Sequence, residues 1–274
     1  MRILVTNDDG IDSPGLHVLA SAIASAGYDT VVAAPDCDQS GTGAAIGIFR
    51  PEAPVEMQRA AIPGSPTIDA WAVTGTPALC ALAARLGGFG PPPDLIVSGI
   101  NTGLNTGRVV LHSGTAGAAL TAQSFGGKGL AVSVEASNPF RFDTAARCAV
   151  DVIPMLLKGP KYSALNLNVP ALAYNELKGM RWARLAPFGA ARSAIVDRGD
   201  DHLYLELQLT NRALPPTSDT KLCNDGYATL TALVGLAEIW TGADGHDLAN
   251  TPVDLAHEMP DSTHTTNIHT RLHA

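Results

Sequence analysis

The chain of 274 residues lacks the features of a secreted scaffold or a membrane protein. Its four cysteines are far apart and form no C-x-x-C pair, which disfavours both a zinc site and a disulfide framework. We expect Cys37, Cys80, Cys148 and Cys223 to be small buried or half-buried residues. No apolar run approaches the ~20 residues of a membrane-spanning helix, so no membrane partner is expected.

Positive charge is also scarce. Charged residues make up 16% of the chain, and the formal net charge is −8. Because phosphate backbones bind clustered lysine and arginine, a nucleic-acid polymer is not expected as a partner. A small anionic substrate is compatible with this charge if a metal ion or a helix N-terminus supplies a local positive field. The start of the chain shows no signal-peptide layout, so we expect a cytoplasmic protein.

Apolar residues, by contrast, are abundant. They make up 46% of the chain, and its length fits one large α/β domain or two small ones. Short apolar runs alternate with helical segments that begin at Ser13-Pro14 or Thr76-Pro77, both typical helix starts. This order is typical of β-α-β units and predicts a mostly parallel sheet. The predicted strands are 3–6, 30–34, 94–98, 130–134 and 164–167, and the predicted helices are 14–26, 77–86, 116–122 and 144–157.

The other segments are less regular. Residues 48–72 carry several prolines and alternating apolar positions, so we expect short strands or a hairpin at the sheet edge. After residue 170, strands are predicted at 180–185, 202–209 and 227–233. These strands are expected to cover an edge of the sheet or to reach a neighbouring subunit. We predict a single domain, 1–274, with a core at about 1–170, a β-rich extension at about 171–247 and a mobile polar tail at about 248–274.

The first predicted strand ends in two adjacent carboxylates, Asp8 and Asp9, followed by Gly10. Two neighbouring negative charges repel each other unless positive charge lies close by, and a divalent cation would supply it. The same pair also fits a solvated turn in which the carboxylates cap the helical segment after them. The pair alone does not decide between these two interpretations.

Other polar residues follow the neighbouring strands. Ser40-Gly41 comes after the second strand, Asn101 after the third, and Ser113-Gly114-Thr115 opens a helix of small residues. Because ligands of an open parallel sheet bind beyond the carboxyl ends of its strands, these residues should meet the acid pair at one end of the sheet. Two carboxylates, a hydroxyl and an amide oxygen suit Mg²⁺ or Mn²⁺, and free N–H groups at a helix start suit an anion. A hard metal ion beside a helix N-terminus predicts a phosphate ester as the substrate.

An ordered series of motifs extends over about residues 1–235. They are Asn7-Asp8-Asp9-Gly10 with Pro14-Gly15, Ala34-Pro35-Asp36 with Ser40-Gly41, Val73-Thr74-Gly75-Thr76-Pro77, Ser98-Gly99-Ile100-Asn101-Thr102-Gly103 with Asn105 and Gly107, Ser113-Gly114-Thr115, Asn166-Leu167-Asn168-Val169-Pro170, and Ser218-Asp219-Thr220 with Gly226-Tyr227. In this series the chain resembles the SurE survival-protein nucleotidases. The order of the motifs is specific, although any one of them alone is not.

The resemblance implies a fold and a reaction. The fold would be a Rossmann-like, three-layer α/β/α core with a β extension that assembles a homodimer or homotetramer. The reaction would be metal-dependent hydrolysis of nucleoside 5′- or 3′-monophosphates and, in some members, of short polyphosphate. One divalent cation per subunit, Mg²⁺ or Mn²⁺ or another ion, would be held by Asp8, Asp9, Ser40 and Asn101.

Together the residues and the resemblance predict a site with named roles. Asp8 would be the general base or the direct nucleophile, and the sequence does not separate the two. His112 adjoins the anion site and fits either a proton donor or a residue that fills the space of an aromatic ring. Catalytic roles are predicted for Asp8, Asp9, Asn101 and Ser113, and substrate or phosphate contacts for Asn7, Ser40, Gly41, Ser113, Gly114, Thr115, Arg108 and His112.

Two segments depart from the family pattern. Thr42-Gly43-Ala44-Ala45 stands where members commonly have a polar Ser-Asn-Ser-like run, and Arg108 to His112 stands where they usually have an acidic pair and a tyrosine. An altered or lost nucleotidase activity, with another phosphorylated metabolite bound or processed, is therefore the alternative. A non-catalytic binder of phosphate esters is a further possibility. A dinucleotide-dependent oxidoreductase is poorly supported, because Asp8-Asp9 stands in place of G-x-G-x-x-G and would repel a pyrophosphate.

Overall fold

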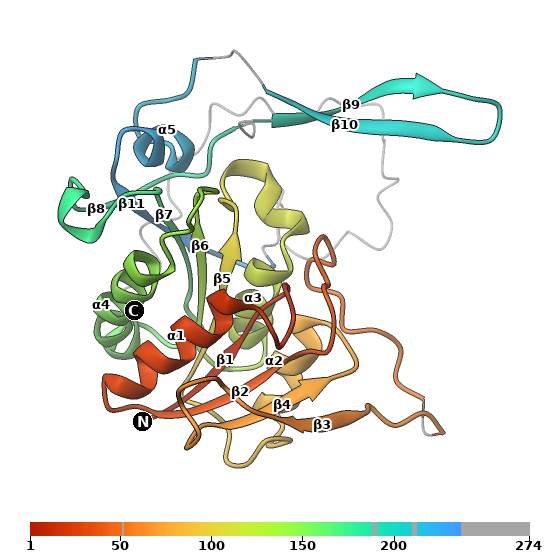
Figure 1. The fold of residues 1–274 in the computed structure, drawn as a ribbon, viewed down its shortest axis with the longest axis vertical. Helices are drawn as coiled ribbons and strands as arrows, with labels where there is room; N and C mark the ends of the chain where they lie inside the picture. Colours follow the sequence, from red (N-terminus) through yellow and green to blue (C-terminus); the bar gives the residue numbers. More distant parts are fainter. Residues whose placement is uncertain (51, 188–190, 210–212, 237–274) are drawn as a thin grey trace, which may run out of the picture. The chain divides into compact units, whose positions relative to one another are not determined.

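The computed structural model describes residues 1–50, 52–187, 191–209 and 213–236. These residues form a nine-stranded sheet with helices on both of its faces, and a separate two-stranded sheet (Figure 1). From one edge to the other, the strands of the large sheet are β3 (Met57–Ala60), β4 (Asp69–Val73), β2 (Asp29–Pro35), β1 (Arg2–Thr6), β5 (Leu95–Thr102), β6 (Gly129–Val134), β7 (Ala164–Val169), β11 (Ala228–Leu233) and β8 (Met180–Trp182).

The middle of this sheet is parallel. Every neighbouring pair from β4 to β7 runs in the same direction, so the carboxyl ends of these strands lie together. We call this the carboxyl end of the sheet and the opposite one the amino end. Antiparallel pairs occur only towards the margins of the described sheet, where β3 pairs with β4 and β11 with β7. The short strands or hairpin expected in residues 48–72, at the sheet edge, are confirmed as the antiparallel pair β3 and β4.

Two pairs of helices cover the two faces. Helix α1 (Pro14–Ser25) packs against α4 (Phe142–Lys158), and α2 (Pro77–Arg85) packs against α3 (Gly114–Ser124). Side chains of β1 alternate between the two faces: Ile3 and Val5 belong to the cluster that includes α1 and α4, whereas Leu4 packs with residues of α2 and α3. The predicted three-layer α/β/α fold with a mostly parallel sheet is confirmed.

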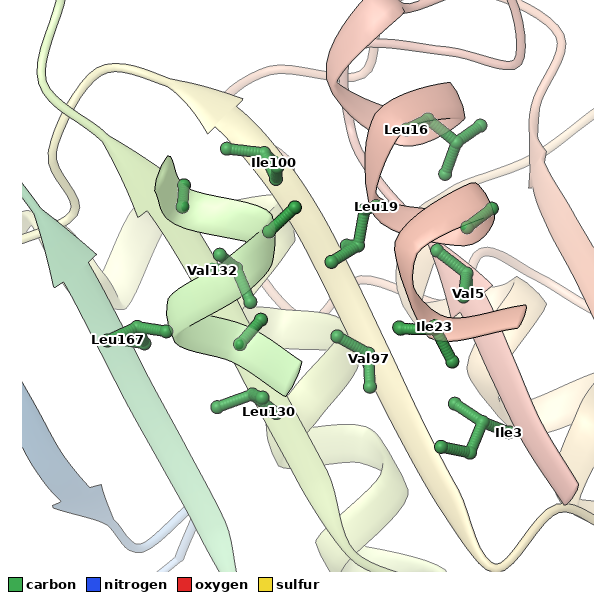
Figure 2. Close-up of a cluster of buried hydrophobic side chains, with 14 of the residues drawn as sticks. Ile3, Val5, Leu16, Leu19, Ile23, Val97, Ile100, Leu130, Val132 and Leu167 are labelled. Carbon is green, nitrogen blue, oxygen red and sulfur yellow. The ribbon is translucent and has the colours of Figure 1, made fainter. Parts of the chain in front are cut away.

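The larger apolar cluster explains why the strands read as continuous apolar runs. Figure 2 shows Leu16, Leu19 and Ile23 of α1 among side chains from β1, β5, β6 and β7. Both faces of these inner strands are buried, so neither face needs polar residues. The five parallel strands predicted from such runs are all present, within one or two residues at most boundaries.

The helix starts follow the predicted caps in two of three cases. The Thr76 hydroxyl accepts from the Leu79 N–H at 3.1 Å, and Ser113 Oγ accepts from the Ala116 N–H at 3.1 Å. Ser13 occupies the N-cap position of α1, but its side chain makes no capping hydrogen bond. At that helix the start is specified by Pro14, whose fixed φ suits the first turn.

Part of the second half of the chain joins the large sheet, and part forms a sheet of its own. Strand β11 folds back antiparallel onto β7, and β8 adds a further strand outside it. Helix α5 (Asp219–Asn224) precedes β11, and β9 (Ala191–Arg198) pairs with β10 (Leu203–Leu209) in the two-stranded sheet. The strand expected at 180–185 is shorter, and β9, α5 and the 3₁₀ turns η1 (Gly107–His112) and η2 (Tyr174–Glu176) were not predicted. The tail expected at 248–274 lies outside the described residues.

Two further expectations can be compared with the structure. None of the described helices is long and apolar enough to cross a membrane. Cys80, Cys148 and Cys223 are buried and unbonded, as expected. Cys37 is exposed, which corrects the expectation of a buried residue, because it lies on the surface loop that leaves β2.

Candidate active site

The acid pair lies directly after β1, at the carboxyl end of the sheet. Asp8 is buried, with 3% of its surface exposed. The Thr115 N–H donates to Asp8 Oδ2 at 3.0 Å, and the Thr115 hydroxyl donates to Asp8 Oδ1 at 2.5 Å. A side chain at Gly114 would place its Cβ 2.8 Å from Asp8 Cβ, so only glycine fits there. The start of α3 is therefore packed directly against the first carboxylate.

Three carboxylates share this end of the sheet. Burial raises the pKa of Asp8, although the two hydrogen bonds from Thr115 act in the opposite direction. Burial, followed by the negative charges of Asp8 and Asp38, raises the pKa of Asp9 to about 6. Hydrogen bonds from Ser40 lower the pKa of Asp38. No lysine, arginine or histidine in the described ranges forms an ion pair with any of these carboxylates, so a cation would be attracted here.

The loop after β2 brings Ser40 to the acid pair. The Gln39 N–H donates to the Asp8 carbonyl oxygen at 2.7 Å. Ser40 donates to Asp38 Oδ1 with its N–H at 2.8 Å and with its hydroxyl at 2.6 Å. Because the hydroxyl hydrogen is used in this bond, the lone pairs of Ser40 Oγ are left for a cation. Gly41 follows with a φ of +82°, in the left-handed region that favours glycine.

Farther along, the same loop passes close to α3. The Gly43 N–H donates to the His112 carbonyl oxygen at 3.1 Å, and the Thr76 hydroxyl donates to the Ala45 carbonyl oxygen. A Cβ at Gly117 would lie 2.1 Å from the Gly43 carbonyl oxygen. Only glycine at that position of α3 lets the loop approach so closely, and the loop that carries Ser40 is thereby fixed against two helices.

Strand β5 brings Asn101 to the same end. β5 continues to Thr102, so Asn101 lies inside the strand rather than after it. The Asn101 side-chain nitrogen donates to the Gly103 carbonyl oxygen at 2.6 Å, which leaves Asn101 Oδ1 as an acceptor for a cation. The Thr102 hydroxyl lies 3.4 Å from Asp9 Oδ1. Asp9 Oδ2 and Asn7 Oδ1 are buried and find no hydrogen-bond partner among the described residues, which is rare for buried polar atoms.

The first turn of α3 offers fewer N–H groups than the sequence predicts. The Ser113 N–H donates to the Val110 carbonyl oxygen, the Thr115 N–H to Asp8, and the Ala116 N–H to Ser113 Oγ. Within the described part of the chain, the Gly114 N–H has no acceptor. Binding of an anion at this helix start therefore depends on the Gly114 amide and on the hydroxyl hydrogen of Ser113.

Arg108 and His112 lie on η1, and both side chains are exposed. Arg108 lines a mostly apolar cavity of about 640 Å³, together with Ile46, Leu111 and Leu120 among others. None of the four predicted metal ligands lines this cavity. The structure thus places Arg108 in a cavity that α3 residues also line, whereas His112 lies next to Ser113 and binds Gly43 through its backbone.

One residue of this site received no role from the sequence. Asp38 adds a third negative charge and holds Ser40 through its N–H and its hydroxyl. A signal was present, since an aspartate two residues before a serine is the spacing of a turn in which the carboxylate accepts the later N–H.

Comparison with known proteins adds to this geometry. A family model described as survival protein SurE matches residues 3–190. The chain belongs to the SurE family. This SurE chain is 35% identical, over 85% of its length and 89% of the relative's, to a protein of Stenotrophomonas maltophilia (strain R551-3) named 5′-nucleotidase SurE. It is 36% identical to the 5′-nucleotidase SurE of Synechococcus sp. (strain JA-3-3Ab), over 85% of its own length and 91% of that protein's.

A solved structure is similar as well. The crystal structure of the SurE protein from Aquifex aeolicus matches with a TM-score of 0.73 and 28% sequence identity, covering 87% of this chain and 95% of that one. The resemblance seen in the sequence is confirmed, as is the α/β fold. The expectation of an enzyme is also confirmed: the SurE chain belongs to a family of phosphoric monoester hydrolases.

The oxygen donors of this SurE chain fit a hard cation. In the described ranges, no group of three or more His, Cys, Asp and Glu side chains is arranged to hold a metal ion. A cation here would instead depend on the carboxylates of Asp8 and Asp9 together with the neutral oxygens of Ser40 and Asn101. An all-oxygen set with unpaired buried oxygens beside it, such as Asp9 Oδ2, suits Mg²⁺ or Mn²⁺ better than a soft metal.

Proposed function

We propose that this SurE chain hydrolyses nucleoside 5′- or 3′-monophosphates, or a related small phosphate ester, to the alcohol and inorganic phosphate. The observation that carries the proposal is the contact between the acid pair and the start of α3. Thr115 binds both oxygens of Asp8, so a base or nucleophile and an anion-binding helix start lie side by side. The relatives named 5′-nucleotidase SurE support the substrate class.

A divalent cation belongs to the proposal. Asp8, Asp9, Ser40 and Asn101 would hold one Mg²⁺ or Mn²⁺ ion per subunit. When bound, the ion supplies positive charge to a phosphoryl oxygen and lowers the pKa of a bound water. Its attraction to the site follows from the raised pKa values of Asp8 and Asp9, which reflect a buried and a half-buried carboxylate without a cationic partner in the described residues.

The start of α3 supports the phosphoryl group. The Gly114 N–H and the Ser113 hydroxyl have hydrogens available for donation, and both lie at the positive end of the helix dipole. Such donors stabilise the negative charge that builds on the equatorial oxygens during transfer. Because Ser113 Oγ also accepts from Ala116, its orientation is fixed before the substrate arrives.

Asp8 has one of two roles in this proposal. As a general base it takes a proton from the attacking water, and burial raises its pKa in the direction that favours proton acceptance near neutral pH. As a nucleophile it attacks phosphorus and displaces the alcohol, and water then hydrolyses the resulting aspartyl phosphate to release inorganic phosphate and restore Asp8. Thr115 holds the carboxylate in one orientation in either case.

A second candidate follows from the changed segment on η1. Arg108 and Leu111 are exposed and line the mostly apolar cavity, in a segment where family members usually have an acidic pair and a tyrosine. A chain changed in this way is compatible with hydrolysis of a different phosphorylated metabolite, or with binding of one without hydrolysis. The acid pair and the start of α3 are the same in both proposals.

A panel of monophosphates tests these alternatives. Phosphate release is measured from nucleoside 5′- and 3′-monophosphates and from 4-nitrophenyl phosphate, with Mn²⁺ and with a chelator. We expect release that requires the metal and is fastest with a nucleotide. Metal-dependent release from a non-nucleotide ester alone would favour the second candidate. Binding without any release would contradict the hydrolase.

Subunit assembly and location belong to the proposal as well. The pair β9 and β10 exposes Ile195, Val196, Leu203, Tyr204 and Leu205, which suits contact with another subunit in a homodimer or homotetramer. Light scattering on the whole chain would measure the number of subunits. The cytoplasmic location stays a prediction.

A further inference from the structure

A buried carboxylate in the second half of the chain binds the segment that leads to Ser113. Asp219 begins α5 and is fully buried, with 0% of its surface exposed. Its Oδ2 accepts from the Gly107 N–H at 2.8 Å. Its Oδ1 accepts from the Ala186 N–H at 3.0 Å and from the Thr220 N–H at 2.7 Å. The Asp219 side chain therefore links three segments: the start of η1, the segment before β9 that contains Ala186, and the start of α5.

Asp219 is held by hydrogen-bond donors alone. None of the lysines, arginines and histidines that the structure describes forms an ion pair with it. A carboxylate offers two oxygens that only accept, so it suits N–H groups on both sides. Asparagine would turn its NH₂ group towards one of these donors and leave that contact broken. The position thus requires aspartate rather than its amide of the same size.

The contact with Gly107 lies at the start of η1. Gly107 has a φ of +59°, in the left-handed region, so the chain turns at the residue that Asp219 holds. η1 ends at His112, directly before Ser113. Its far end is held in turn by the hydrogen bond between the His112 carbonyl oxygen and the Gly43 N–H.

The residues just before η1 are fixed from the other side. The Asn105 N–H donates to Asn168 Oδ1 at 2.8 Å, and the Asn105 carbonyl oxygen accepts from the side chains of Asn166 and Asn168. The Asn105 side chain donates to Ser133 Oγ at 3.0 Å. Residues of β6 and β7 thus hold the segment just before η1, and Asp219 holds Gly107, the first residue of η1.

We propose that Asp219 is a positioning residue for the phosphate-ester hydrolysis proposed above, on which this inference rests. By holding the Gly107 amide, it sets where η1 delivers Ser113 and Gly114 to the phosphate. It touches neither the ester nor a cation, and acts only through η1. Asp8 and Asp9 follow β1 and Asn101 lies on β5; of these three, only Asp8 is linked to the start of α3, through Thr115.

The test is Asp219→Asn in the whole chain, assayed with 4-nitrophenyl phosphate and Mn²⁺. We expect KM and the inhibition constant of inorganic phosphate each to rise about tenfold, because the phosphate contacts are displaced. The Mn²⁺ dissociation constant should rise less than these two constants, because β1 and β5 are untouched and only Asp8 contacts the start of α3, through Thr115. A purely structural role would instead lower the thermal midpoint and leave KM and the phosphate inhibition constant unchanged, which would overturn the inference.

Two further variants complete the test. Lys128→Met removes three hydrogen bonds to carbonyl oxygens at the amino end of the sheet and should lower the thermal midpoint without raising KM. Gly107→Ala strains the same turn from the η1 side and should raise KM and the phosphate inhibition constant as Asp219→Asn does. If Asp219→Asn does not fold, Gly107→Ala decides, and unchanged constants in that variant overturn the inference.

The wild-type assay separates the two proposals. If wild type releases no phosphate with Mn²⁺, the proposed function fails and this inference falls with it. If wild type is active and Asp219→Asn keeps its KM and phosphate inhibition constant, only the inference about Asp219 fails.

Discussion

The two ends of the large sheet differ in how charge is balanced. At the amino end, the Arg2 guanidinium pairs with Asp29 at 2.7 Å, and the Arg2 N–H donates to Asp94 at 2.8 Å. Lys128 Nζ donates to three carbonyl oxygens at the end of α4. Each of these charges has partners within the protein.

At the carboxyl end, the negative charges have no cationic partners of this kind among the described residues. After burial, the charge of Asp38 helps to raise the pKa of Asp8, and the charges of Asp8 and Asp38 help to raise that of Asp9; no cationic side chain in the described residues pairs with these three carboxylates. The same strands β1, β5 and β6 run between the two ends, so the fold itself does not impose this difference. In the described sheet, negative charge is uncompensated at the carboxyl end alone, which indicates that this end is suited to bind a cation.

Asp8→Asn should have the largest effect on activity. It keeps the size of the side chain and removes the charge, so the fold should persist while turnover falls by about 10³-fold or more. The measurement is kcat/KM for the best nucleotide of the panel, beside the thermal midpoint. Lys128→Met at the amino end is the matched control and should keep kcat/KM. Near-normal turnover of Asp8→Asn would sink the proposed mechanism.

The contrast between the two ends also shows what the sequence could predict. Strands β1, β2, β5, β6 and β7 were predictable because both of their faces are buried and they read as continuous apolar runs. β9 was missed because Ala191–Arg198 mixes polar and apolar residues without a clear period, and α5 because six residues give too little periodicity.

For the site, the sequence predicts that its residues meet at one end of the sheet, but it does not predict the hydrogen bonds between them. Parallel topology brings Asp8, Ser40, Asn101 and Ser113 to one end, and the sequence indicates that topology. The bond between Thr115 and Asp8 joins residues 107 positions apart, and no local pattern specifies it. Asp219 was visible as part of a family motif, but its contact with Gly107 spans 112 positions and depends on how α5 packs.

A second test compares two glycines at the two ends of the sheet. A Cβ at Gly117 would lie 2.1 Å from the Gly43 carbonyl oxygen, and one at Gly129 would lie 2.2 Å from the Ala119 carbonyl oxygen. Both Gly→Ala variants should lose about 1–3 kcal/mol of stability, because something must shift in each. Only Gly117→Ala displaces the Ser40 loop, so only it should lose about 10- to 100-fold in kcat/KM. Equal losses of activity in the two folded variants would contradict the expectation that only Gly117 positions the loop that carries Ser40.

The smallest expected effect concerns pH. Asp9 keeps its proton in the folded, metal-free chain up to about pH 6, whereas an unfolded chain releases it near ~3.9. The folded state therefore binds more protons between these values, and the metal-free chain loses stability as pH rises through this window. Relative to Asp9→Asn, wild type without metal should gain about 1–3 kcal/mol between pH 7.5 and pH 4.5. Denaturant unfolding at the two pH values measures this, and a difference that is flat or opposite in sign would contradict the assigned burial and charge repulsion.

We propose that the carboxyl end of the sheet holds one divalent cation through Asp8, Asp9, Ser40 and Asn101. The most direct test of this proposal is a titration of the metal-free chain with Mn²⁺ at pH 7.5, followed by electron paramagnetic resonance. We expect one bound ion per chain, with affinity weakened about 100-fold or more in Asp9→Asn and unchanged in Lys128→Met. Binding of equal strength in wild type and Asp9→Asn would contradict it.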